Sequence, residues 1–152
     1  RADGSLWRAG LRDPQGGPTS VAGVVELPVG GMASLSTSGD NLGPLGVLAP
    51  EVVVRAAGSA SDHHARETSR ETAAGGGRVF DHHIIDPRTG YPANAGVRQV
   101  SVVASSGVLA EALSTALLVD PSIDVPDVVA CWARETGAPA SARVVSLVRV
   151  GS

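Results

Sequence analysis

Aromatic residues are scarce in this chain: only 3% of its 152 residues are Phe, Trp or Tyr, and its formal net charge is −3. Proteins that bind nucleic acid usually offer a basic surface or aromatic platforms for the bases. Neither feature is present, so nucleic acid is not expected as a partner. No apolar run approaches about 20 residues, the length that a membrane-spanning helix needs, so no transmembrane segment is expected.

Cysteine is almost absent as well. The lone Cys131 excludes an internal disulfide, and we predict that it packs as a small apolar residue beside Trp132. No signal peptide is visible, but a chain that lacks its first half could not show one. The start at Arg1 without methionine is typical of such a fragment. These features leave the compartment open. Length and composition, with 43% hydrophobic and 18% charged residues, fit a single domain over residues 1–152.

The periodicity of apolar residues predicts an α+β fold with a mixed or antiparallel sheet and about two helices. Alternating or β-branched segments indicate strands, and Ala- and Leu-rich segments with apolar residues three and four apart indicate helices. The predicted strands cover residues 6–12, 22–29, 32–37, 97–104 and 142–150, and the predicted helices cover 107–119 and 125–136. Residues 41–79 show little periodicity and include three consecutive glycines, so we expect an insertion that is mostly a mobile loop.

The helix predicted over 107–119 places Glu111 and Thr115 one turn apart on the same side. A carboxylate and a hydroxyl are oxygen donors that suit Mg²⁺, which keeps several waters and shares its other positions with substrate phosphate. A simpler interpretation is also open. A glutamate in the first turns of a helix is favoured by the helix dipole alone, and the threonine hydroxyl can bond to the preceding turn.

The segment from Asp81 to Gly90 is predicted to be a strand end that runs into a turn, because Asp-Pro initiates turns. Neighbouring histidines in a strand face opposite ways, so at most one of His82 and His83 faces a given pocket. A histidine can exchange a proton near neutral pH, and Asp86 or Asp81 can orient its ring. Histidine pairs in strands are nevertheless more often structural than catalytic.

A third motif, Leu35-Ser36-Thr37-Ser38-Gly39-Asp40, is a strand end with small hydroxyl residues and a glycine, which allow close approach to an anion. Such turns are common and mean little alone. Together, the segments 6–14, 36–40, 83–90 and 100–116 resemble one family in the same order: the FAD:protein FMN transferases, also called the ApbE family. The chain would then correspond to the C-terminal, T-fold-like portion of such a protein.

The resemblance implies an enzyme that uses Mg²⁺ to cleave the pyrophosphate of FAD, transfers FMN to a Thr or Ser hydroxyl of an acceptor protein, and releases AMP. It assigns the metal ligands to Glu111 and Thr115 and the catalytic histidine to His83. It places the turn formed by Thr37, Ser38 and Gly39 beside the flavin, and it adds Asp86 and Thr89 to the cofactor-binding residues.

Two departures from the family pattern keep alternatives open. The metal-binding carboxylate is usually aspartate, whereas this chain has Glu111, and Mg²⁺ demands near-ideal octahedral geometry. The chain also begins at the Trp7 segment and is about half as long as the proteins it resembles, so an N-terminal half with glycine-rich and lysine-bearing segments is an expected partner. The alternatives are a flavin-binding or partner subunit without catalysis, and a hydrolase that splits FAD into FMN and AMP.

Overall fold

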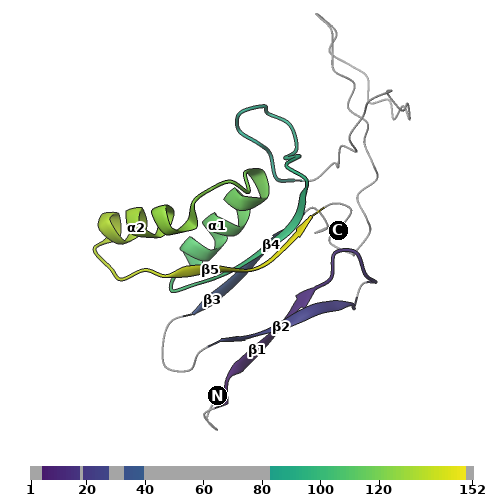
Figure 1. Cartoon of the computed structure of the whole chain (residues 1–152), viewed down its shortest axis with the longest axis horizontal. Helices are drawn as coiled ribbons and strands as arrows, with labels where there is room; N and C mark the ends of the chain where they lie inside the picture. Colours follow the sequence, from purple (N-terminus) through teal and green to yellow (C-terminus); the bar gives the residue numbers. More distant parts are fainter. Residues whose placement is uncertain (1–4, 18, 28–32, 40–82, 150–152) are drawn as a thin grey trace, which may run out of the picture.

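The described residues of the computed structural model are 5–17, 19–27, 33–39 and 83–149, and they form two antiparallel sheets and two helices (Figure 1). The predicted α+β class is therefore confirmed. The stretch 41–79, which we expected to be an insertion, lies outside the described residues. None of the described helices is long and apolar enough to cross a membrane.

The first sheet is a hairpin of β1 (Trp7–Arg12) and β2 (Val21–Leu27). The Asp-Pro-Gln-Gly-Gly segment after β1 forms its turn, in which the Asp13 N–H donates to the Ser20 carbonyl at 2.9 Å and the Gly16 N–H donates to the Asp13 carbonyl at 3.2 Å. These turn contacts bring β1 and β2 together in their register.

The second sheet has the order β3 (Ser34–Gly39), β4 (Val97–Ala104), β5 (Ala142–Arg149), with both pairs antiparallel. The central strand β4 is rich in valine, and every one of its residues except Arg98 is buried. Burial on both sides is possible because each face of this sheet is covered by a different layer.

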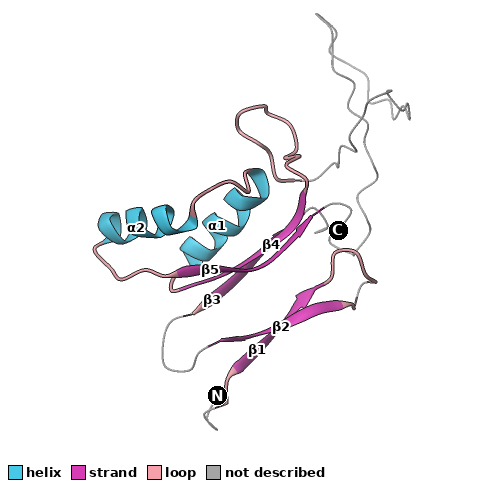
Figure 2. Ribbon diagram, in the orientation of Figure 1, coloured by secondary structure: helices cyan, strands magenta, loops and turns pink. Residues whose placement is uncertain are grey.

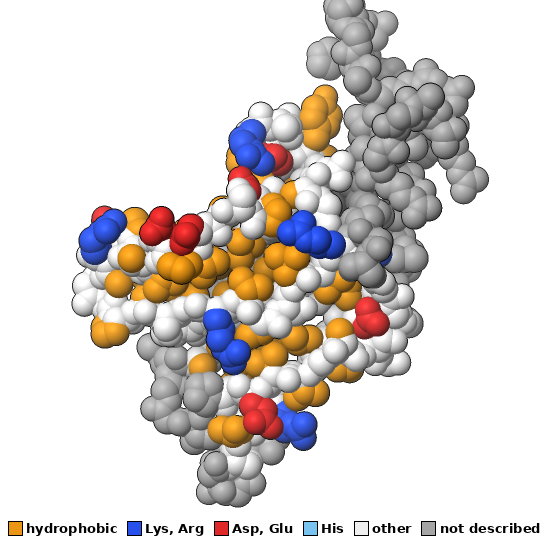
Figure 3. Space-filling view, viewed as in Figure 1, with side chains coloured by type: hydrophobic (Ala, Val, Ile, Leu, Met, Phe, Trp, Pro, Cys, Tyr) orange, Lys and Arg blue, Asp and Glu red, His pale blue; other side chains and the backbone are white. Residues whose placement is uncertain are grey.

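Helix α1 (Gly107–Val119) covers one face of the sheet, and the β1–β2 hairpin covers the other (Figure 2). On the helical side the largest buried side chains are Leu109, Leu113, Leu118, Val100 and Val102. On the hairpin side Leu11 and Val25 pack against Val103. Hydrophobic side chains gather over the centre of the view in Figure 3.

Helix α2 (Val125–Thr136) carries its own start and stop signals. The Asp124 carboxylate accepts from the Asp127 N–H at 3.0 Å as an N-cap, and Gly137 ends the helix in the left-handed conformation at φ 66°. Its half-buried Val128, Val129 and Trp132 pack against the same core as α1.

Two local predictions were wrong. The segment expected to end a strand before the Asp-Pro turn forms only an isolated bridge between Ile85 and Pro92 in its described part. Cys131, expected to pack beside Trp132, is exposed. The half-buried residues of α2 follow one helical stripe, and Cys131 falls on the flank of that stripe.

Replacing Leu109 by Ala should lower the free energy of unfolding by about 2–5 kcal/mol, since the side chain is 1% exposed and its loss leaves a cavity in the main core. Denaturant unfolding measures the change. Val108→Ala is the matched control. Val108 precedes Leu109 in the same helix and is 66% exposed, so its replacement should change the free energy of unfolding by less than about 0.5 kcal/mol. Equal losses in the two variants would contradict the assigned helix orientation.

Candidate functional site

The face of β3 that meets α1 is lined by serines. Residues two apart in a strand share a face, and Ser36 and Ser38 both bond to side chains of α1. Leu35, the residue before Ser36, packs on the opposite side with the hairpin core. The strand therefore presents hydroxyls, instead of the valines that β4 presents, to the helix that carries Glu111 and Thr115.

A continuous set of hydrogen bonds links this serine face to the helix. Ser36 Oγ donates to Glu111 Oε2, and Ser114 Oγ lies 3.2 Å from Ser36 Oγ and 3.1 Å from the Glu111 carbonyl oxygen. Ser38 Oγ lies 2.8 Å from Ser114 Oγ and 2.9 Å from Thr115 Oγ1. Four hydroxyls and one carboxylate thus form a single chain of contacts, called here the hydroxyl chain.

Beside the hydroxyl chain lies an open pocket of about 390 Å³. Its lining comes from β3, from the segment before the Asp-Pro turn, and from α1: Thr37, Ser38, His83, Ile84, Ile85, Glu111 and Thr115. Five of these seven are residues that the sequence had singled out as catalytic, flavin-binding or metal-binding. Three segments far apart in the chain therefore meet at one cavity.

His83 is exposed at this pocket, next to a residue that is firmly anchored. The following Ile84 is buried in the main core, and its carbonyl accepts from the Ala93 N–H at 2.9 Å. These contacts fix the backbone beside His83 and leave the imidazole accessible. His82, the other candidate of the pair, lies outside the described residues.

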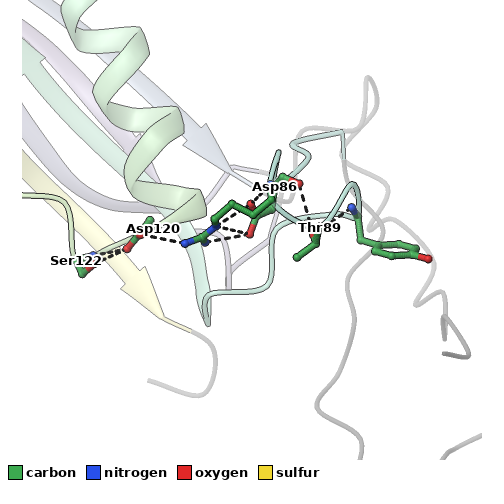
Figure 4. Close-up of polar contacts among 6 residues, drawn as sticks. Asp86, Thr89, Asp120 and Ser122 are labelled. Carbon is green, nitrogen blue, oxygen red and sulfur yellow. Dashed lines mark hydrogen bonds and ion pairs between the residues drawn. The ribbon is translucent and has the colours of Figure 1, made fainter.

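The turn after His83 is tied to the end of α1 by an arginine. Arg88 donates to the Asp86 carboxylate, with an ion-pair distance of 3.0 Å, and its guanidinium also reaches Asp120 Oδ2 at 3.3 Å. Asp120 caps the C-terminus of α1, where a carboxylate alone is unfavourable and a cation is favourable. Figure 4 shows the guanidinium between the two carboxylates.

Each carboxyl group of this network is stabilised in its ionised form. Hydrogen bonds from the Arg88 side chain and backbone hold the pKa of Asp86 below its usual value, and burial opposes them only in part. Hydrogen bonds from the Ser122 side chain and backbone are the main cause of the lowered pKa of Asp120, to which the Arg88 charge adds. The pKa of Arg88 is raised in turn, first by its bonds to Asp86.

Three predicted cofactor-binding residues do not line the pocket. Asp86 and Thr89 belong to the turn, where the Asp86 carbonyl accepts from the Thr89 and Gly90 backbone N–H groups. Gly39 is buried at the end of β3, where an added Cβ would lie 3.1 Å from the Arg98 carbonyl oxygen. Their contacts are structural, and a role in cofactor binding stays a prediction.

Sequence reasoning did not assign a role to Ser36 or Ser114, although both are central members of the hydroxyl chain. Two signals were available. Ser36 shares a strand face with Ser38, and Ser114 lies three residues after Glu111 and so on its side of the helix. Ser114 is fully buried, and a buried hydroxyl in an apolar helix stripe usually has a partner.

The donors at the pocket fit a magnesium ion that completes its coordination with water and substrate. Glu111 and Thr115 offer two hard oxygen atoms from adjacent turns of α1, which is the donor type that Mg²⁺ prefers. In the part of the chain that the structure describes, no group of three His, Cys, Asp or Glu side chains is arranged to hold a metal ion. Metal binding by Glu111 and Thr115 stays a prediction.

The chain belongs to the ApbE family, whose model matches residues 56–140. This range includes His83, Glu111 and Thr115. The chain is also similar to the ApbE protein of Thermotoga maritima, with 27% identity and a TM-score of 0.47 over 96% of this chain. The aligned chain spans 36% of that protein's length. Comparison with curated proteins gave no match.

Replacing Arg88 by Met should destabilise the protein at pH 7, and the difference from wild type should shrink in acid. Both carboxyl pKa values are lowered by folding, so their contribution is present above the ordinary aspartate value of about 3.9. It is lost as the pH falls through the lower values of the folded state. Thermal unfolding midpoints of both proteins between pH 7 and pH 2 test this. A constant difference across that range would contradict the ion-pair assignment.

Proposed function

We propose that this chain forms part of a Mg²⁺-dependent FAD:protein FMN transferase, which moves FMN from FAD to a threonine or serine hydroxyl of an acceptor protein. One observation carries the proposal: His83, Glu111 and Thr115 line one open pocket together with Thr37 and Ser38 of β3. Membership of the ApbE family supports it.

The proposed reaction exchanges one phosphorus–oxygen bond for another. The acceptor hydroxyl oxygen forms a bond to the FMN phosphorus of FAD, the bond from that phosphorus to the bridging oxygen breaks, and AMP leaves with the bridging oxygen. The acceptor hydroxyl loses its proton during the exchange. Such transfers depend mainly on positioning and on charge stabilisation at the phosphates.

Glu111 and Thr115 would hold the magnesium ion, which supplies neutralisation of the pyrophosphate charge when bound. Ser36 donates to the Glu111 carboxylate, so one carboxylate oxygen is fixed to β3. This contact gives the longer glutamate side chain a defined position where the family usually has aspartate. The carboxylate is thereby oriented before any ligand arrives, which lowers the entropic cost of binding.

His83 would accept the proton of the acceptor hydroxyl. Its exposure at the pocket allows a side chain of another protein to reach the imidazole. The anchored Ile84 beside it keeps the imidazole near Glu111 and Thr115 while α1 stays packed on the sheet. A general base of this kind contributes roughly 10²-fold to 10⁴-fold in rate.

Incubation with FAD, Mg²⁺ and an acceptor peptide that presents threonine should give covalently bound FMN and an equal amount of AMP. His83→Ala should lower the rate roughly 10²-fold to 10⁴-fold through loss of the base. Glu111→Ala should abolish turnover, because a metal ligand is removed. Peptide mass and AMP release are measured together. Cys131→Ser, exposed on α2, is the control variant and should keep wild-type activity.

The same assay separates the alternatives. AMP release without labelled peptide would indicate an FAD pyrophosphatase, in which water replaces the acceptor hydroxyl. Flavin binding without AMP release would indicate a binding or partner subunit. The chain spans 36% of the length of the Thermotoga maritima protein. Each assay is therefore run twice, once with this chain alone and once with the complete protein, meaning the full-length product of the gene that encodes this chain. Full activity of both His83→Ala and Glu111→Ala in the complete protein would refute the site assignment.

A further inference from the structure

We propose that the hydroxyl chain is oriented by the acceptor oxygens of Glu111, its carboxylate and its main-chain carbonyl, and that it leaves the lone pairs of Thr115 Oγ1 available to a cation in the pocket. Ser38 and Ser114 are then positioning residues for the metal ligand Thr115. This inference rests on the proposed function, because it concerns the magnesium ion of that site.

The direction of the hydroxyl chain begins at its charged end. An ionised carboxylate only accepts hydrogen bonds, and a serine hydroxyl has a single proton to donate. The Ser36 proton is used in the bond to Glu111 Oε2. The contact of 3.2 Å between Ser36 and Ser114 therefore requires Ser114 to be the donor.

Ser114 has no proton left for Ser38. Its hydroxyl lies near two oxygens, Ser36 Oγ at 3.2 Å and the Glu111 carbonyl at 3.1 Å, and both act as acceptors. Whichever of them receives the proton, the bond of 2.8 Å between Ser114 and Ser38 must be donated by Ser38. Ser114 is fully buried and Ser38 is 4% exposed, so water competes little for these bonds.

Thr115 carries the last hydroxyl of the hydroxyl chain. Since Ser38 donates to Ser114, the bond of 2.9 Å between Ser38 and Thr115 must be donated by Thr115. A threonine inside a helix usually donates to a carbonyl of the preceding turn. For Thr115 that carbonyl is the one of Glu111, which here already lies 3.1 Å from Ser114 Oγ. The Thr115 proton is thus used in the bond to Ser38.

A hydroxyl whose proton is already donated to a protein acceptor can offer only lone pairs to a ligand. Thr115 Oγ1 is therefore prepared for a hard cation and is poorly suited to donate to a bare phosphate oxygen. Partners in the outer shell of a metal site fix the orientation of its ligands, and their loss typically lowers metal affinity 10–100-fold. The same range is expected for breaks in the hydroxyl chain.

The test is titration of the purified chain with Mn²⁺, with the free ion followed by electron paramagnetic resonance. Ser114→Ala removes the acceptor of Ser38, whose proton can then turn to Thr115 and displace the Thr115 proton toward the cation. Ser38→Ala removes the acceptor of Thr115 directly. Each variant should bind Mn²⁺ about 10–100-fold more weakly than wild type.

The double variant Ser38→Ala/Ser114→Ala should bind no more weakly than Ser38→Ala alone, within about twofold, because a break at Ser38 already isolates Thr115 from Ser114. Two independent losses would instead multiply. This non-additivity is a result that a purely structural role of the two serines does not produce. Thermal unfolding of every variant accompanies the titration.

Ser101→Ala is the matched control. Ser101 is also fully buried, and its Oγ lies 2.9 Å from Thr37 Oγ1. Neither hydroxyl belongs to the hydroxyl chain. A comparable loss of stability with unchanged Mn²⁺ affinity is expected. If Ser114→Ala does not fold, Ser38→Ala against Ser101→Ala decides the question.

The outcomes separate this inference from the proposed function. Wild-type affinity in Ser38→Ala and Ser114→Ala, with weakened binding in Thr115→Val, would overturn the hydroxyl chain and leave the metal site standing. Unchanged affinity in both Thr115→Val and Glu111→Ala, or no Mn²⁺ binding by wild type, would overturn the metal site and this inference together.

Discussion

The contact between Ser36 and Glu111 is the interaction on which the rest of the site depends. It joins a strand to a helix that begins about 70 residues later in the chain, and it gives the carboxylate one fixed acceptor role. Together with the Glu111 carbonyl oxygen, which also only accepts, it sets the direction of the contacts of Ser114, Ser38 and Thr115. Without these two acceptors at one end, the four hydroxyls could donate either way and would present no defined set of lone pairs to a ligand.

The serine face of β3 costs apolar burial that valines would provide at the same positions. The fold compensates elsewhere: β4 supplies Val100 and Val102 to the core under α1, and β4 is also covered on its other side by the hairpin. The polar strand lies at the edge of the sheet order and the apolar strand at its centre. The central strand β4 thus contributes mainly to the core and the edge strand β3 mainly to the pocket, and α1 packs against both.

The strands and helices could be predicted because local patterns determine them. Alternation marks β4, and the spacing of Leu109, Leu113 and Leu117 marks the buried stripe of α1. The meeting of His83 with Glu111 and Thr115 was expected only from the family resemblance. The Ser36–Glu111 and Arg88–Asp120 pairs could not be predicted, because each depends on how a strand or turn lies along a distant helix. No local sequence pattern determines how distant elements pack against each other. The exposure of Cys131 likewise depends on which side of α2 packs against the core.

Two walls of the pocket, β3 and the segment around His83, come before α1 in the chain, and each has its own anchor in the fold. β3 is fixed by its pairing with β4, and the backbone beside His83 is fixed by the buried Ile84 and its bond from Ala93. Because each of these two walls is anchored to the sheet or to the main core, a core substitution such as one at Ile84 is expected to alter the shape of the pocket as well as the stability of the fold.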